Sequence, residues 1–147
     1  MLENWELIAR ERIRDTVAAY THSGDRGRVE QLAECFTEDG VLEIKGQETA
    51  TGRAGIITML TGVVEHASAA LADGRPGIVR HFVTNLRFDE ITPQLARTSS
   101  YFLVMTANGP DHWGRYRDVL VPVGDRWLIT HRLVRLDASA ETSTMAR

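Results

Sequence analysis

The sequence contains a single cysteine, Cys35, so no disulfide can form within the chain. A lone cysteine fits a reducing compartment, and its place between Glu34 and Phe36 on an expected helix indicates packing. No uncharged stretch is apolar over the about 20 residues that span a bilayer. Residues 1–15 are too rich in charged side chains for a secretory signal. We therefore expect a cytoplasmic protein that does not contact a membrane.

The chain also lacks a basic block. Its 17 Lys and Arg residues are spread along the sequence and are outnumbered by 20 Asp and Glu, which gives a net charge of −3. This pattern argues against nucleic acid as a partner, because phosphate backbones are bound by clustered positive charge. A length of 147 residues with 43% hydrophobic content is enough for one domain with its own core.

The first half of the sequence has helical periodicity. Two apolar stripes recur every three or four residues on either side of "HSGD": Trp5, Ala9, Ile13, Val17 and Tyr20, then Val29, Leu32, Ala33 and Phe36. "TEDG" at 37–40 predicts a turn after the second helix, and "VLEIKG" predicts a short strand. A third helix is expected over 51–72, with Thr51 as its cap and "DGRPG" as its end.

The second half is extended. Four long runs are separated by turn-forming segments and predict an antiparallel meander: 78–88, 95–107, 112–123 and 126–136. Helices followed by a meander predict an α+β fold in which the helices cover one face of the sheet. A sheet that curls around its helices leaves a blind, mostly apolar cavity. Residues 138–147 have no periodicity and are expected to be mobile or to fold only on a neighbour.

The order of elements and four motifs resemble a known family, the SnoaL-like branch of the nuclear-transport-factor-two-like superfamily. The motifs are "IRDTVAAYTHSGDRGRVEQLAECFTEDGVLEI", "TGRAGI", "RHFVTNL" and "GRYRDVLVPVGDRWLITHRLVRLD", and the resemblance extends over about residues 5–137. It implies one domain over 1–137, built as a cone-shaped α+β barrel with three N-terminal helices on a curved, mostly antiparallel sheet around an interior pocket. Because this fold hosts enzymes, small subunits and plain binders, it does not decide function.

Enzymes of the family share an aspartate after the first helix and a histidine on the first long strand. Asp25 and His81 match these positions, and Tyr20 lies where the dehydratases often place a tyrosine. A histidine in a half-dry pocket accepts a proton near neutral pH, and a carboxylate beside it fixes the tautomer and stabilises the imidazolium. Tyr20 would then donate a hydrogen bond to a substrate oxygen. Acid–base assistance is worth about 10² to 10⁴ in rate, so the substrate should already be activated.

Each of these three residues also has a structural explanation. Asp25 lies where an acidic N-cap would stabilise the second helix. Arg26 and Arg28 in the first turn of that helix interact unfavourably with the helix dipole, and an acidic cap would offset them. Strict alternation along the strand places His81 on the same face as Val79, Val83 and Asn85. The opposite face then carries Phe82, Leu86 and Phe88. On that face His81 could be a core histidine bonded to a backbone carbonyl. Tyr20 continues the apolar stripe of its helix and is structural about as often as catalytic.

The later strands supply three candidates for substrate binding: Tyr116, Trp113 and Arg132. Alternation places Tyr116 and Asp118 on one strand face and Trp113, Arg115 and Arg117 on the other, and leaves open which set lines the cavity. On the last strand the expected core face is Trp127, Ile129 and Leu133. Arg132 is then on the opposite face, where it either closes a pocket or pairs with a carboxylate. A salt bridge on the surface is the more common arrangement for such an arginine.

The remaining histidines give no metal pattern. His22 is expected in a loop and His66 in solvent, while His112 and His131 lie on separate strands with no carboxylate at metal-ligand spacing. Neither a phosphate-binding glycine loop nor a serine-centred elbow occurs. We predict no metal and no cofactor.

We interpret the sequence as that of a cofactor-independent lyase or isomerase. His81 would abstract a proton from a small hydrophobic substrate, aromatic or polycyclic in kind. The alternative is a non-catalytic module, either a carrier of a hydrophobic ligand or the small subunit of a ring-hydroxylating oxygenase. In both cases the helix-free face of the sheet predicts self-association as a homodimer or homotrimer.

Overall fold

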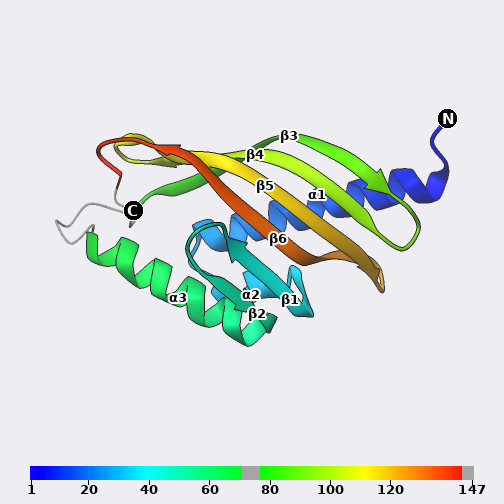
Figure 1. Cartoon of the computed structure of the whole chain (residues 1–147), viewed down its shortest axis with the longest axis horizontal. Coiled ribbons are helices and arrows are strands. Elements are labelled where there is room, and N and C mark those ends of the chain that lie inside the picture. Colours follow the sequence, from blue (N-terminus) through cyan, green and yellow to red (C-terminus); the bar gives the residue numbers. More distant parts are fainter. Residues whose placement is uncertain (71–76, 144–147) are drawn as a thin grey trace.

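The computed structural model describes residues 1–70 and 77–143. Within them, three helices and six strands follow one another (Figure 1): α1 (Asn4–Asp25), α2 (Val29–Ala33), β1 (Phe36–Ile44), β2 (Thr49–Thr51), α3 (Gly52–Ala70), β3 (Val79–Ile91), β4 (Ala96–Thr106), β5 (Gly109–Val123) and β6 (Arg126–Ser139). The strands form one open sheet in the order β2-β1-β6-β5-β4-β3, in which β1 and β6 are parallel and the other neighbours antiparallel. The α+β prediction is confirmed.

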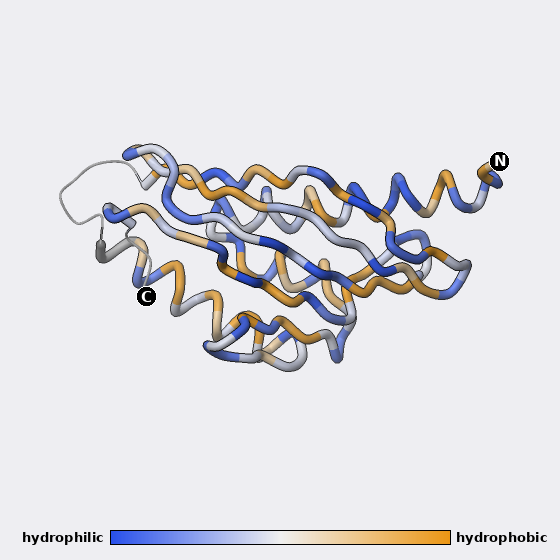
Figure 2. Tube along the Cα trace, turned by 45° about the horizontal axis from the view of Figure 1, so that its top comes forward, coloured by the Kyte–Doolittle hydropathy of each residue, from blue (hydrophilic) through white to orange (hydrophobic). Residues whose placement is uncertain are grey.

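Helix α1 forms one wall of the core. Trp5 at the start of the predicted stripe is only partly buried. The other four members of the stripe are buried together with Thr16: Ala9, Ile13, Thr16, Val17 and Tyr20. Apolar and polar residues alternate along this helix in Figure 2, as expected for a helix with one buried face. The stripe packs against Phe36 of β1, Leu120 of β5 and Ile129 of β6. None of the described helices has the length and apolar character needed to cross a membrane.

Several predicted boundaries are wrong in the first half of the chain. Helix α1 continues through His22 to Asp25, so "HSGD" is helical and not a loop. Helix α2 ends at Ala33, and the "TEDG" segment is part of β1, whose pairing with β6 is irregular between Phe36 and Val41. The strand absorbs these residues as a bulge, which has no signature in the apolar pattern. The predicted end of the third helix lies largely outside the described residues.

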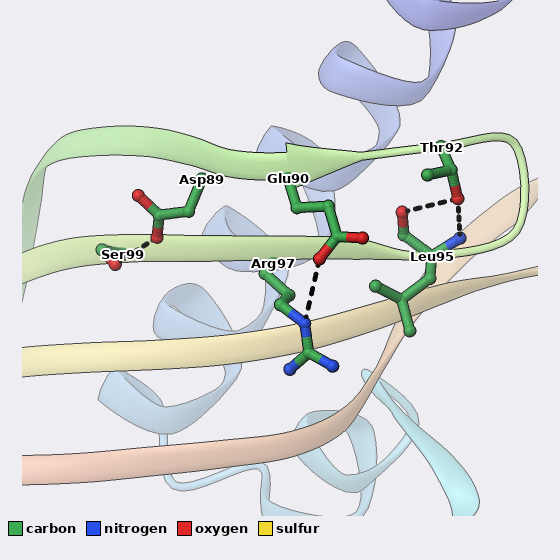
Figure 3. Close-up of polar contacts among 6 residues, drawn as sticks. All are labelled: Asp89, Glu90, Thr92, Leu95, Arg97 and Ser99. Carbon is green, nitrogen blue, oxygen red and sulfur yellow. Dashed lines mark hydrogen bonds and ion pairs between the residues drawn. The ribbon is translucent and has the colours of Figure 1, made fainter.

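The four-stranded meander β3 to β6 is confirmed. At the β3–β4 turn, the Thr92 hydroxyl accepts a hydrogen bond from the backbone N–H of Leu95 at 3.1 Å. Beside the turn, Arg97 donates to Glu90 at 3.2 Å and Ser99 donates to Asp89 at 2.5 Å (Figure 3). These cross-strand contacts fix the register of β3, the edge strand that carries His81.

A bulge in β3 overturns part of the predicted alternation. The pairing with β4 shifts between Thr84 and Arg87, and Asn85 has a positive φ of 58°. The extra residue reverses the phase of the strand. As a result Leu86 and Phe88 are partly buried on the same side as His81 instead of on the opposite face, while Phe82 is exposed as expected.

Strand β6 extends to Ser139, two residues into the segment predicted to be a tail. Beyond it, the backbone N–H of Ala140 donates to the Asp111 carbonyl at 2.8 Å, and the Ser143 hydroxyl donates to the Asp111 carboxylate at 2.7 Å. Residues 138–143 therefore lie against the start of β5. The mobility of the last residues stays a prediction, because 144–147 lie outside the described residues.

Candidate active site

Asp25 and His81 meet where the end of α1 approaches the start of β3. The Nδ1 atom of His81 lies 2.5 Å from Oδ1 of Asp25, and the backbone N–H of His81 donates to Oδ2 at 3.0 Å. The Asp25 side chain is only 8% exposed, while that of His81 is 24% exposed. Because Nδ1 faces the carboxylate, Nε2 is the nitrogen left for another molecule.

These contacts decide between the explanations of Asp25. The N-cap of α2 is Arg28, and no side chain caps that helix. Asp25 is instead the last residue of α1. Its two carboxylate oxygens form hydrogen bonds with the ring and the backbone N–H of His81. The capping interpretation is therefore wrong. His81 also differs from a core histidine bonded to a backbone carbonyl, since its ring nitrogen faces a carboxylate.

His81 borders a groove between α1 and β3 with a volume of about 460 Å³. The wall from α1 consists of residues spaced i, i+3, i+4, i+7 and i+8, which share one helix face: Arg14, Val17, Ala18, Thr21 and His22. The facing wall from β3 includes His81, Val83 and Asn85. The site next to His81 is thus an open groove, not the blind cavity that the curled sheet predicted.

Arg132 pairs with a carboxylate, which is one of its two predicted arrangements, but the pair is buried and not on the surface. The pairing of β5 with β6 shifts between Val119 and Leu120, so β6 changes phase before Arg132 and turns this side chain inward. Its guanidinium donates two hydrogen bonds of 2.8 Å to Asp118. Burial by itself lowers the pKa of Arg132, but the charge and hydrogen bonds of Asp118 outweigh it and raise the pKa. Arg132 therefore stays charged although it is buried.

Two tyrosines enclose this guanidinium. The centre of the Arg132 guanidinium lies 3.9 Å from the ring centroid of Tyr116 and 4.2 Å from that of Tyr20, a geometry in which the ring faces stabilise the cation. Burial raises the pKa of both phenols. For Tyr116 the charges of Asp118 and Asp25 also raise the pKa, while the Arg132 guanidinium lowers it.

The predicted site residues therefore divide into three places. Asp25 and His81 form a hydrogen-bonded pair at the groove. Tyr20, Tyr116 and Arg132 form a packed interior cluster, and none of the three borders the groove. Trp113 pairs across from Leu103 of β4 on the opposite face of the sheet from Tyr116, so it belongs to neither group.

Sequence reasoning missed several polar residues near this site. Thr21 and His22 border the groove, and a helix prediction extended by five residues would have placed them on the stripe of Val17. Asn85 also borders the groove, on the strand face that alternation assigned to His81, but no role was assigned to it from the sequence. Elsewhere His112 pairs with its neighbour Asp111 at 2.7 Å. No described group of three or more His, Cys, Asp or Glu side chains could hold a metal ion.

A model of the SnoaL-like domain matches residues 5–133. The chain belongs to this SnoaL-like family. Among solved structures, the SnoaL-like chain is 30% identical to a protein from Catenulispora acidiphila in complex with S-DNPA, with a TM-score of 0.71 and coverage of 87% of this chain and 92% of that one. Among curated proteins, no sequence matches it.

Two further structures share the fold of this SnoaL-like domain. A scytalone dehydratase-like protein from Novosphingobium aromaticivorans is 20% identical, with a TM-score of 0.80 and coverage of 99% of this chain and 94% of that one. LinA is 17% identical, with a TM-score of 0.77 and coverage of 97% of each chain. At these identities the likeness shows the fold alone.

Proposed function

We propose that this SnoaL-like domain is a cofactor-independent lyase or isomerase that removes a proton from a small hydrophobic substrate, aromatic or polycyclic in kind. The observation that supports the proposal is the 2.5 Å contact between His81 Nδ1 and Asp25 Oδ1 at the wall of an open groove. A partly exposed imidazole held by a nearly buried carboxylate is the arrangement expected of a general base.

In this mechanism Asp25 orients His81. Hydrogen bonding to Oδ1 places the proton of the neutral imidazole on Nδ1, so Nε2 carries the lone pair that accepts the substrate proton. The imidazolium that forms is stabilised by the carboxylate. The electron pair of the broken C–H bond then forms a double bond, either by expelling a leaving group or by moving charge onto a conjugated oxygen. Return of the proton to another carbon completes an isomerisation.

A hydrogen-bond donor for the substrate oxygen completes the site. Tyr20 was predicted for this role, but its ring packs against Arg132 away from the groove. Asn85 borders the groove four residues from His81 and is held at φ 58°, a conformation that is uncommon outside glycine and concentrates at functional sites. We assign the donor role to the Asn85 amide.

Solvent exchange tests the proposal. The probe is 2-tetralone, a bicyclic ketone with activated C–H bonds, incubated in D₂O and followed by NMR for deuterium uptake. We expect the wild type to accelerate uptake and His81→Ala to lower the catalysed rate by roughly 10² to 10⁴. His131→Ala is the matched control, because His131 also pairs with a carboxylate, Glu43, but on the surface. Equal uptake in wild type, His81→Ala and buffer across a panel of such ketones would support the non-catalytic alternative.

A further inference from the structure

We infer that the groove selects amphipathic substrates with an anionic group, a carboxylate or sulfonate, which Arg14 binds at the end remote from His81. The inference names the substrate class of the proposed enzyme, and it rests on the proposed function only for which end of the ligand reacts. Three observations support the anion site: the position of Arg14 in the groove, the absence of a described carboxylate partner for it, and the side chains that line the groove between Arg14 and His81.

Arg14 and His81 lie at opposite ends of the groove. Helix α1 runs antiparallel to β3, because Asp25 at its end meets His81 while Arg14 lies over the Phe88 ring, 5.1 Å from its centroid. Arg14 and His22 are eight residues apart on one helix face, which is about 12 Å at 1.5 Å per residue. A ligand that reaches both ends is therefore elongated.

The charge of Arg14 is not neutralised by the protein. Among the residues that the structure describes, no carboxylate forms an ion pair with Arg14, and its guanidinium lies over the Phe88 ring. Arg10, one turn earlier, also lies over Phe88 but donates to Glu6 at 2.6 Å. The two arginines thus share an environment and differ in whether a carboxylate is supplied. A guanidinium binds oxyanions such as carboxylates through paired N–H groups, and two oxygens of a sulfonate can accept in the same way.

The rest of the groove matches an apolar body with one charged end. Val17, Val83 and Leu86 supply apolar lining, and uncharged polar side chains lie beside them. The described lining includes Arg14, His22 and His81 but no Asp or Glu, and its uncharged polar members are Thr21, Thr84 and Asn85. Its volume of about 460 Å³ is within the roughly 300–1,000 Å³ of small-molecule sites. The lining therefore favours an aromatic or polycyclic acid over its neutral analogue.

Two fluorescent probes that differ by one sulfonate test the inference. They are 1-anilinonaphthalene-8-sulfonate, which is anionic, and N-phenyl-1-naphthylamine, its neutral counterpart. We expect Arg14→Gln to weaken binding of the anionic probe about tenfold, the scale of one charge-assisted hydrogen bond, and to change binding of the neutral probe less than about twofold. The loss of affinity for the anionic probe caused by Arg14→Gln should be smaller at high salt, because Arg14 is exposed to solvent and its charge is screened.

Two variants locate the effect. Arg12→Gln removes a charge from the exposed side of the same helix and should change neither affinity. Ala18→Trp fills the groove and should weaken both probes. The inference is overturned if Arg14→Gln leaves the anionic probe unaffected or weakens both probes equally, or if Ala18→Trp leaves both unaffected. His81→Ala should retain probe binding, so loss of deuterium exchange without loss of binding separates failure of the proposed function from failure of the anion site.

Discussion

At the scale of single residues, the interior combines a hydrogen-bonded ion pair with buried polar atoms that have no hydrogen-bond partner among the described residues. Thr98, Asp118 and Arg132 form one row across β4, β5 and β6. Arg132 donates two hydrogen bonds to Asp118, but its Nη1 and the Thr98 hydroxyl are both buried and have no hydrogen-bond partner in the part of the chain that the structure describes. A buried hydroxyl without a partner costs about 1–3 kcal/mol. Thr98 should therefore weaken the fold.

Replacing this hydroxyl by a methyl group should stabilise the protein. We expect Thr98→Val to raise the free energy of unfolding by about 1 kcal/mol, measured by urea denaturation. Thr16→Val is the matched control, because Thr16 is equally buried but its hydroxyl donates to the Trp127 carbonyl at 2.5 Å. That variant should lower the free energy of unfolding by about 1–3 kcal/mol, since the carbonyl loses its donor. Destabilisation of similar size in both variants would show that Thr98 has a hydrogen-bond partner.

The same scale shows what the sequence could predict of the site. Residue chemistry and family resemblance together selected Asp25 and His81, and the two side chains do meet. Arg132 was misplaced because period-two alternation holds only in an uninterrupted strand, and one extra residue before it reverses the face. Tyr20 was expected at the substrate from the family resemblance, whereas its place on the apolar stripe of α1 indicated a structural role. A helix stripe says which side chains are buried and not what they face.

At the scale of elements, the meander was predictable and the bulges were not. Runs of β-branched and aromatic residues located β3 to β6 to within about three residues, and turn-forming segments located their connections. Strand β2 has three residues, too few for a period to appear. Bulges depend on pairing between strands far apart in sequence, so they leave no local pattern.

One bulge makes a glycine necessary. The pairing of β5 with β6 shifts at Gly114, where an added Cβ would lie 2.0 Å from the backbone carbonyl oxygen of Arg135. We expect Gly114→Ala to lower the free energy of unfolding by about 3 kcal/mol, because backbone must move to relieve the overlap. Gly62→Ala in α3 is the control, since its Cβ would meet nothing within 4 Å and alanine favours a helix by about 1 kcal/mol. Thermal melting should shift in opposite directions, and equal shifts would contradict the assigned close approach.

At the scale of the whole molecule, the sheet has one face packed on helices and one face without them. On the free face Phe82, Leu103 and Trp113 form a row across β3, β4 and β5. Phe82 and the neighbouring Tyr101 are 53% and 54% exposed, unusually open for large aromatic side chains. A contiguous apolar area of this kind is typical of an interaction surface.

We therefore propose that this face joins identical chains into a homodimer or homotrimer. Sedimentation velocity at micromolar concentration should give the mass of two or three chains for the wild type, and Phe82→Glu combined with Tyr101→Glu should give a single chain, because burying four carboxylates or more in one interface is strongly unfavourable. Val123→Glu tests whether position matters, since Val123 is 47% exposed but lies at the β5–β6 turn. It should leave the oligomer intact. A wild type that sediments as one chain at every concentration would contradict the proposal, and dissociation by Val123→Glu would move the interface to the turn.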